Sequence, residues 1–270
     1  MPTVVRAWLR DAAEALALRG IPSALLDAEI ILGHTLRQSR TWLHAHGEDP
    51  IEPRKLEIAD ARLDLRKDRV PVAYIIGHKE FYGRLFHVNP SVLIPRPESE
   101  EIIEQLKKCV TATDSTLLDV GTGSGCLGIT AKLEFPHLRV TLADISPHAL
   151  TVARGNADDL SADVTLIHSY LLEHIVERFG IIIANLPYVD TAWERSPETN
   201  HEPAEALFAK DAGMSLIKKL ISEAPGSLTA SGRLLIEADP EQHDALCELA
   251  SLHHFSVVTR SHYIIVFQIA

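Results

Sequence analysis

The chain of 270 residues is long enough for two domains, and its 46% hydrophobic and 23% charged residues exclude a disordered protein. No apolar run approaches the roughly 18 residues needed to span a bilayer, so we expect no membrane partner. The net charge of -11 argues against direct binding to nucleic acid, which usually requires a basic surface, and favours a protein or small-molecule partner.

Residues 1–72 are predicted to form a small helical domain. Ser23 is expected to cap its second helix, and Pro53 fits the first turn of its third. Acidic residues interrupt the first twenty positions, which therefore lack the apolar block of a signal peptide, and we expect a cytoplasmic protein. A bundle of this kind commonly recognises a partner. The first helix, which ends near Gly20, is predicted from the helical spacing of Val5, Trp8, Leu9, Ala12 and Leu16.

Residues 73–97 change character and are predicted to be a hairpin linker. Aromatic and β-branched residues on both sides of Gly83 indicate two short strands. Three prolines, Pro90, Pro95 and Pro97, then interrupt the chain as they would in a connection between domains.

Residues 98–270 alternate between strand-like and helical segments, which predicts an α/β domain with a parallel sheet covered on both faces. The last two strand-like runs are joined by only three residues, so they must pair antiparallel. A parallel sheet that ends in an antiparallel hairpin resembles the seven-stranded, Rossmann-like sheet of class I methyltransferases. The predicted strands cover residues 116–120, 139–143, 164–168, 181–184, 233–237, 255–259 and 263–269.

A glycine loop follows the first strand of this domain. Glycine at positions 121, 123 and 125 lets the chain turn tightly and lets its backbone approach a ligand. The next helix begins at once, so its free N–H groups face the same ligand. Asp144 ends the second strand, where a carboxylate suits the two hydroxyls of a ribose. Glycine at alternate positions fits a ligand without a pyrophosphate, such as S-adenosylmethionine.

A dinucleotide is the competing ligand, because residues 123–128 spell a literal GxGxxG. That motif begins two residues later than a dinucleotide-binding loop would, and it places its last glycine, Gly128, inside the predicted helix. A frame that starts at Gly121 needs glycine at position 126 and finds Cys126. We therefore expect S-adenosylmethionine rather than NAD.

A polar tetrad, Asn185-Leu186-Pro187-Tyr188, follows the fourth strand. Because ligands bind at the carboxyl ends of parallel strands, the tetrad should meet the glycine loop and Asp144 at one site. A side-chain amide is a poor nucleophile, and two acceptors that hold its N–H groups would aim its lone pair. The Asn185 side-chain oxygen and the Leu186 carbonyl can serve, Pro187 stiffens the turn, and Tyr188 can lie against the planar amide.

No metal is predicted. The three cysteines, Cys109, Cys126 and Cys247, form no CxxC pair, and the fourteen histidines have no acidic or cysteine partners at ligand spacing. The chemistry of the tetrad also needs no metal, because position and electrostatics suffice.

Over nearly its whole length the sequence resembles the protein-(glutamine) methyltransferases that modify the Gly-Gly-Gln motif of peptide chain release factors. The most specific match is the segment 92–100, Val-Leu-Ile-Pro-Arg-Pro-Glu-Ser-Glu, just before the glycine loop. Further matches lie at 27–30, at 71–77, and after the tetrad at Glu202-Pro203 and 211–214.

The resemblance implies a helical domain that docks the release factor, a hairpin linker and a catalytic domain. It implies that Gly121, Thr122, Gly123, Ser124, Gly125, Asp144 and Asn185 contact S-adenosylmethionine. It also implies that Asn185, Leu186, Pro187 and Tyr188 contact the substrate.

Two positions depart from the family pattern. The family usually has Asn-Pro-Pro-Tyr, and Leu186 replaces the first proline, which preserves a backbone carbonyl in a less rigid loop. The third strand of the sheet usually ends in aspartate followed by an aromatic residue. Here Ser169 and Tyr170 follow, so Tyr170 keeps the stacking on the cofactor while the hydrogen bond to adenine is in question.

Two alternative functions remain at this point. A methyltransferase of an exocyclic amino group in RNA or DNA would use the same tetrad, but the acidic charge and the segment 94–98 disfavour it. A cofactor-binding scaffold without catalytic activity would explain Leu186 and Ser169. The intact Asn185, Pro187 and Tyr188 argue against such a scaffold.

Overall fold

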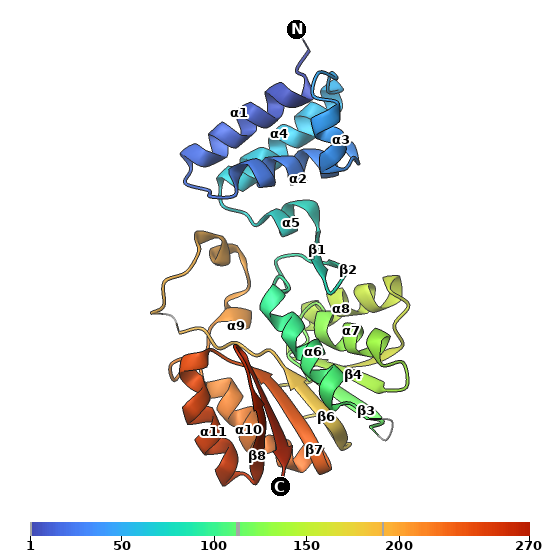
Figure 1. Ribbon diagram of the computed structural model, residues 1–270, viewed down its shortest axis with the longest axis vertical. Coiled ribbons are helices and arrows are strands. Elements are labelled where there is room, and N and C mark those ends of the chain that lie inside the picture. Colours follow the sequence, from blue (N-terminus) through green and yellow to red (C-terminus); the bar gives the residue numbers. More distant parts are fainter. Residues whose placement is uncertain (1, 112–113, 191) are drawn as a thin grey trace. The chain divides into compact units, whose positions relative to one another are not determined.

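The computed structural model describes residues 2–111, 114–190 and 192–270 (Figure 1). Four positions of the predicted domains, Met1, Ala112, Thr113 and Thr191, lie outside the described residues. Contacts within the chain divide it into two units. The first comprises Met1–His78 together with Ser196–His201, and the second comprises Lys79–Arg195 and Glu202–Ala270.

The first unit is a bundle of helices. Helix α1 buries the five apolar residues that predicted it, and it ends where the N–H of Gly20 bonds to the carbonyl of Ala17. Pro53 occupies the first turn of α4, as expected from its fixed φ angle. The helices are α1 (Val5–Leu18), α2 (Ala24–Leu36), α3 (Arg40–Ala45), α4 (Pro53–Lys67) and α5 (Val72–Ile76).

Two features of this unit differ from the sequence prediction. Ser23 precedes α2 but makes no capping bond, because its hydroxyl donates instead to Asp27 Oδ2 at 2.9 Å. The short helices α3 and α5 were not predicted, since neither is long enough to show a periodic apolar pattern. Helix α3 depends on its N-cap, where the Ser39 hydroxyl accepts the N–H of Trp42.

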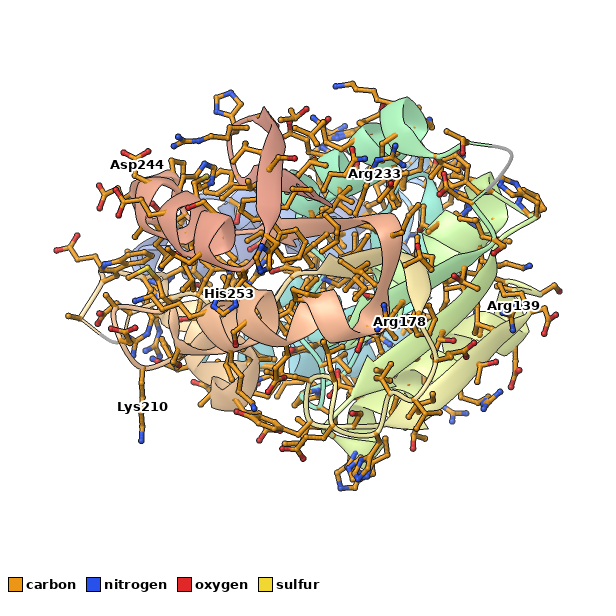
Figure 2. All side chains as sticks on the ribbon, turned by 90° about the horizontal axis from the view of Figure 1, so that it is seen from below. Arg139, Arg178, Lys210, Arg233, Asp244 and His253 are labelled. Carbon is orange, nitrogen blue, oxygen red and sulfur yellow. The ribbon has the colours of Figure 1, made fainter. Side chains whose placement is uncertain are left out.

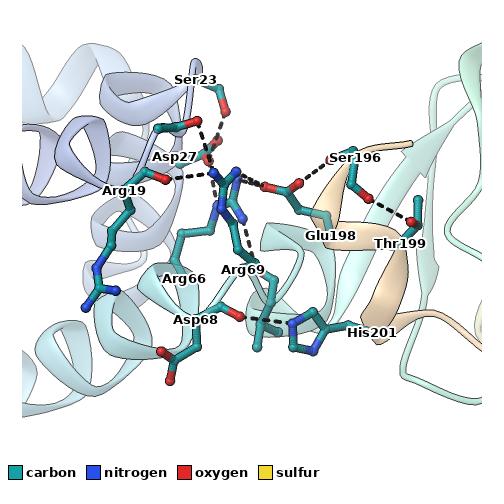
Figure 3. A network of polar contacts seen from close by, with 12 residues as sticks. Arg19, Ser23, Asp27, Arg66, Asp68, Arg69, Ser196, Glu198, Thr199 and His201 are labelled. Atoms are coloured by element: carbon teal, nitrogen blue, oxygen red, sulfur yellow. Dashed lines mark hydrogen bonds and ion pairs between the residues drawn. The ribbon is translucent and has the colours of Figure 1, made fainter. Parts of the chain in front are cut away.

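A network of ion pairs joins α2 and α4 to the segment Ser196–His201 (Figure 3). The buried Arg66 guanidinium donates to Asp27 Oδ2 at 2.7 Å and to Glu198 Oε1 at 2.8 Å. Arg69 donates to the same Glu198 oxygen at 3.0 Å. Burial acts to raise the pKa of Glu198, but hydrogen bonds from Ser196, Arg66 and Arg69 lower it to about 2. Glu198 is therefore ionised at neutral pH and holds this segment to the helices.

The second unit contains a two-stranded hairpin, apart from its first residue His78, and a seven-stranded sheet with its helices. Tyr82 and Gly83 both have positive φ angles, 52° and 73°, as a tight two-residue hairpin turn requires. The hairpin consists of β1 (His78–Phe81) and β2 (Arg84–His87). The sheet consists of β3 (Thr116–Val120), β4 (Arg139–Asp144), β5 (Val164–His168), β6 (Phe179–Ala184), β7 (Leu228–Glu237), β8 (Phe255–Arg260) and β9 (Ile264–Ile269).

Apolar residues on both faces of the sheet form two cores. Leu118 and Ile182 belong to one core, and their neighbours Leu117 and Ile181 belong to the other, because successive side chains of a strand point to opposite faces. Helices α10 (Ser215–Ser227) and α11 (His243–Leu252) cover the first face. The opposite face is covered by α6 (Glu100–Cys109), α7 (Cys126–Glu134) and α8 (Pro147–Asp159) (Figure 1).

The strand order is β5-β4-β3-β6-β7-β9-β8. Strands β3 to β7 are parallel, and β9 pairs antiparallel with both β7 and β8. The predicted seven-stranded sheet with its antiparallel C-terminal hairpin is thus confirmed. Strand β7 begins five residues earlier than the predicted strand, before an irregularity where Ser231 has a φ of 65°. An irregular start of this kind has no alternating pattern by which the sequence could reveal it.

The amino ends and the carboxyl ends of the parallel strands carry different residues. At the amino ends, Arg139 begins β4 and Arg178 precedes β6, and both arginines are labelled in Figure 2. Arg139 pairs with Glu177, and Arg178 donates to the carbonyl of Leu228. The predicted functional segments all follow the carboxyl ends. None of the helices among the described residues combines the length and the apolar character required to cross a membrane.

Candidate functional site

Three separate segments at the carboxyl ends of the parallel strands line one pocket of the second unit. The glycine loop follows β3, Asp144 ends β4, and the tetrad follows β6. Gly125 and Tyr188 are the two predicted site residues that do not line this pocket. Those that do line it are Gly121, Thr122, Gly123, Ser124, Asp144, Tyr170, Asn185, Leu186 and Pro187.

The three alternate glycines all adopt the left-handed conformation, with φ angles of 72° at Gly121, 56° at Gly123 and 83° at Gly125. They differ in what surrounds them. A Cβ at Gly121 would lie 2.8 Å from the Leu186 side chain, so this glycine lets the loop and the tetrad approach each other. A Cβ at Gly123 would meet nothing within 4 Å and would extend into open space. Gly123 is therefore the position where a ligand can lie against bare backbone.

Gly128, the last glycine of the GxGxxG string, has a packing role. A Cβ there would lie 2.2 Å from the Leu142 side chain, so only glycine lets α7 lie this close to β4. Its N–H donates to Asp119 Oδ2 at 2.9 Å. Gly125 is also structural, because its Cβ would lie 2.6 Å from Ile129. The string therefore arises from helix packing and gives no support to a dinucleotide.

Two carboxylates lie behind the glycine loop. Asp144 accepts the N–H of Gly123 at 2.9 Å and that of Ser146 at 2.8 Å, which fixes it at the end of β4. Asp119, which the sequence analysis did not single out, is buried, and its Oδ1 has no hydrogen-bond partner in the described part of the chain. Burial, followed by the charge of Asp144, raises the pKa of Asp119 to about 6, although hydrogen bonds from Thr122 and the N–H of Gly128 act to lower it. Such a pair favours a cationic ligand, and S-adenosylmethionine carries both a sulfonium and an ammonium group.

The side chain of Asn185 is oriented by a buried hydroxyl. Its Nδ2 donates to the Oγ of Ser99 at 2.8 Å, and Ser99 is only 2% exposed. The amide oxygen is the acceptor of this carboxamide, so it is the atom that can receive a hydrogen bond from a substrate. Ser99 lies in the segment 92–100, so this family-like segment positions the tetrad.

The side chain of Tyr188 is anchored outside the pocket lining. Its hydroxyl donates to Glu237 Oε1 at 2.9 Å, and Glu237 is buried at the end of β7. Burial raises the pKa of Glu237, while the Ser99 and Tyr188 hydroxyls act to lower it. Gln242 donates to the Tyr188 carbonyl at 3.0 Å. Gly213 is essential nearby, because a Cβ there would lie 1.9 Å from the same carbonyl oxygen.

This anchoring leads to a prediction for Tyr188→Phe. We expect the loss of the hydroxyl to destabilise the fold by about 1–3 kcal/mol, because the buried Glu237 loses a hydrogen-bond donor. Methyl transfer should stay within a few-fold of wild type, whereas Tyr188→Ala should lower it severely. Denaturant unfolding and single-turnover transfer, measured on the same samples, separate the two effects. A phenylalanine variant with normal stability but poor transfer would assign the hydroxyl to catalysis.

Two further segments line the pocket and were not predicted as site residues. The first segment contains Arg96 and follows the hairpin, and the second contains Pro203 and follows the tetrad. Glu202 joins the two segments, because its carboxylate accepts hydrogen bonds from Arg96 at 2.6 Å and from the N–H of Ile94 at 3.1 Å. Glu202 is 7% exposed, so these are largely desolvated bonds. Both segments match the family in the sequence, and this resemblance could have indicated that they contribute to the site.

The structure shows what Ser169, which departs from the family pattern, contributes to the fold. The Ser169 hydroxyl donates to the carbonyl of Leu171 and accepts the N–H of His174, so it shapes the loop that follows β5. Tyr170 lines the pocket beside it, with Lys219 Nζ 5.5 Å from its ring centre. Among the described residues, no group of three or more His, Cys, Asp or Glu side chains is suited to hold a metal ion.

Comparison with known proteins identifies both parts of the chain. Residues 7–77 match the family model described as PrmC N-terminal domain, and residues 98–267 match the methyltransferase small domain. A release factor glutamine methyltransferase of Deinococcus radiodurans is 34% identical over 90% of this chain and 88% of its own. The protein of the same name from Koribacter versatilis is 39% identical over 81% of this chain and 82% of its own.

Solved structures support the fold. A methyltransferase from Pyrococcus furiosus superposes with a TM-score of 0.54 at 19% identity, over 77% of this chain and 96% of its own. The 16S rRNA N2 G1207 methyltransferase of T. thermophilus, solved with AdoMet and guanosine, gives a TM-score of 0.52 at 18% identity. That match covers 71% of this chain and 49% of the other.

Proposed function

The chain belongs to the release factor glutamine methyltransferases, and we propose that it methylates the glutamine of the Gly-Gly-Gln motif in peptide chain release factors. The methyl group comes from S-adenosylmethionine and is transferred to the side-chain amide nitrogen of that glutamine. The observation that carries the proposal is the Asn185 carboxamide, whose nitrogen is held by Ser99 at the pocket that the glycine loop also lines.

The tetrad acts by orienting the substrate amide. The lone pair of an amide nitrogen is delocalised into its carbonyl, so the nitrogen attacks only when it is aimed at the methyl group. The Asn185 oxygen and the Leu186 carbonyl accept its two N–H groups and fix its direction. An amide nitrogen that has gained a methyl group while carrying both protons is very acidic. It therefore loses a proton to water, and the reaction needs no strong base.

The residues of the pocket fit the cofactor. S-adenosylmethionine supplies a methyl group bonded to a positively charged sulfur. Gly123 offers backbone without a side chain, and Asp144 retains lone pairs for hydroxyl groups after its two backbone bonds. Tyr170 offers a ring for stacking, and the neighbouring carboxylates Asp119 and Asp144 provide negative charge for a cationic ligand.

The proposed function is tested with purified release factor and radiolabelled S-adenosylmethionine. We expect one methyl group per release factor, which peptide mass spectrometry should locate on the glutamine of Gly-Gly-Gln. A release factor in which that glutamine is replaced by alanine should acquire no label. Label that persists in the replaced protein would show that another residue is the substrate.

The helical unit is the part that we propose to dock the release factor. It carries no predicted catalytic residue, and its match to the PrmC N-terminal domain is separate from the match to the methyltransferase domain. Because release factors work with ribosomes, a cytoplasmic location is part of the same proposal.

Nucleic acid should be neither a substrate nor a competitor. The second unit bears the negative charge of the chain, since residues 1–78 contain eleven basic and eleven acidic side chains. We therefore expect excess ribosomal RNA or DNA to leave the rate of release-factor methylation unchanged and to acquire no methyl group. Incorporation into purified nucleic acid at a comparable rate would favour an exocyclic amino group as the substrate.

A further inference from the structure

A second pocket lies in the helical unit, between the end of α2, helix α4 and His78, and positively charged or titratable side chains dominate its lining. The basic and histidine side chains are His34, Arg37, Arg40, Lys55, Arg62 and His78. The single carboxylate in the lining, Glu29, is already engaged, since Arg40 donates to its Oε2 at 2.6 Å and His44 lies 2.9 Å from its Oε1. The pocket therefore holds positive charge that no neighbouring carboxylate balances.

The donors of this pocket are only partly used. The Arg62 guanidinium makes one hydrogen bond in the described part of the chain, from Nη1 to the Thr35 hydroxyl at 2.8 Å. The side chains of Arg37 and Lys55 make no hydrogen bond or ion pair among the described residues. His34 Nδ1 is buried and likewise has no partner there. An anion in the pocket would supply acceptors to this set of donors.

The positively charged side chains of this pocket repel one another. Burial lowers the pKa of His34, and the positive charges of Arg62, His78 and Arg37 lower it further. Burial also lowers the pKa of Arg62. The first 78 residues have no net charge, so the positive charge of this pocket is a local feature of the unit. Such a local, partly desolvated cluster suits one small anion rather than an extended polyanion, which the acidic remainder of the chain would repel.

We infer that this pocket binds a carboxylate side chain on the surface of the release factor and so docks the substrate, an inference that rests on the proposed function. A guanidinium presents paired N–H donors that match the two oxygens of a carboxylate. Arg62 is the central ligand in this arrangement, and Lys55, on the same helix, adds charge at the pocket wall.

The test compares three variants that each remove one positive charge from α4. Arg62→Gln and Lys55→Gln change the pocket, whereas Arg54→Gln is the matched control, since Arg54 is exposed and does not line the pocket. Each is assayed on intact release factor and on a short peptide that contains Gly-Gly-Gln. For the pocket variants we expect KM for the release factor to rise about tenfold, with kcat and all peptide parameters unchanged.

Several outcomes decide the matter. Equal KM values in all three variants would overturn the inference, even if the enzyme is fully active. A wild-type enzyme that methylates neither substrate would instead overturn the proposed function. If Arg62→Gln does not fold, as judged by circular dichroism, Lys55→Gln alone carries the test. A pocket variant that loses affinity for RNA while keeping its KM for release factor would assign the pocket to a different partner and refute the docking role.

Discussion

Replacing Asn185 with alanine should lower single-turnover methyl transfer by about 10² to 10³, the usual effect of losing one preorganised hydrogen-bond partner in an active site. The side-chain oxygen of Asn185 is one of two proposed acceptors for the substrate amide, and alanine removes it. The Ser99 hydroxyl, which now accepts from Asn185 Nδ2 at 2.8 Å, would remain buried without that donor. The assay uses saturating S-adenosylmethionine and release factor, with cofactor affinity measured separately by calorimetry.

Leu186→Pro is the control for this experiment, because Leu186 is proposed to act only through its carbonyl. Proline keeps that carbonyl and stiffens the loop, so most of the activity should remain. The variant loses some packing, since the Leu186 side chain is buried against the core beside Gly121. Near-normal turnover in Asn185→Ala would refute the proposed mechanism. An inactive Leu186→Pro enzyme would show that the loop of this chain has a geometry unlike that of its family.

Replacing Gly123 with valine should weaken binding of S-adenosylmethionine by about 10- to 100-fold, as expected for extra side-chain atoms forced into an occupied site. A Cβ at Gly123 would meet no protein atom within 4 Å, so a larger side chain would enter the space left for the ligand. The φ angle of 56° adds backbone strain for any residue with a Cβ. Calorimetry on the folded variant measures the loss, and NAD should not bind to either protein.

Gly83→Val separates strain from ligand exclusion. Gly83 also has a positive φ, 73°, and a Cβ there would likewise meet nothing within 4 Å, but it lies in the turn between β1 and β2. Both variants should lose stability in thermal unfolding, and only Gly123→Val should lose affinity. Equal affinities in the two variants, or binding of NAD by the wild type, would contradict the assignment of the glycine loop to S-adenosylmethionine.

The sequence by itself determined the architecture of the sheet. Runs such as those at 116–120 and 164–168 reveal their bounds because aliphatic and β-branched residues dominate them and polar or glycine residues flank them. It also determined which strand ends carry the glycine loop, Asp144 and the tetrad, because parallel strands bring their carboxyl ends to one edge. Short helices such as α3 remained hidden, since six residues show no periodicity.

Only the tertiary structure decided which side chains meet. The bonds from Asn185 to Ser99 and from Tyr188 to Glu237 span 86 and 49 residues, and no local pattern encodes such partners. The place of Ser196–His201 among the helices depends on Arg66, which lies 132 residues from Glu198. The same holds for the second pocket, whose basic side chains come from α4, from α3 and from the end of α2 in a chain of net charge -11. Composition sums charge over the whole chain, whereas an electrostatic site depends on which residues the fold brings within a few ångströms of one another.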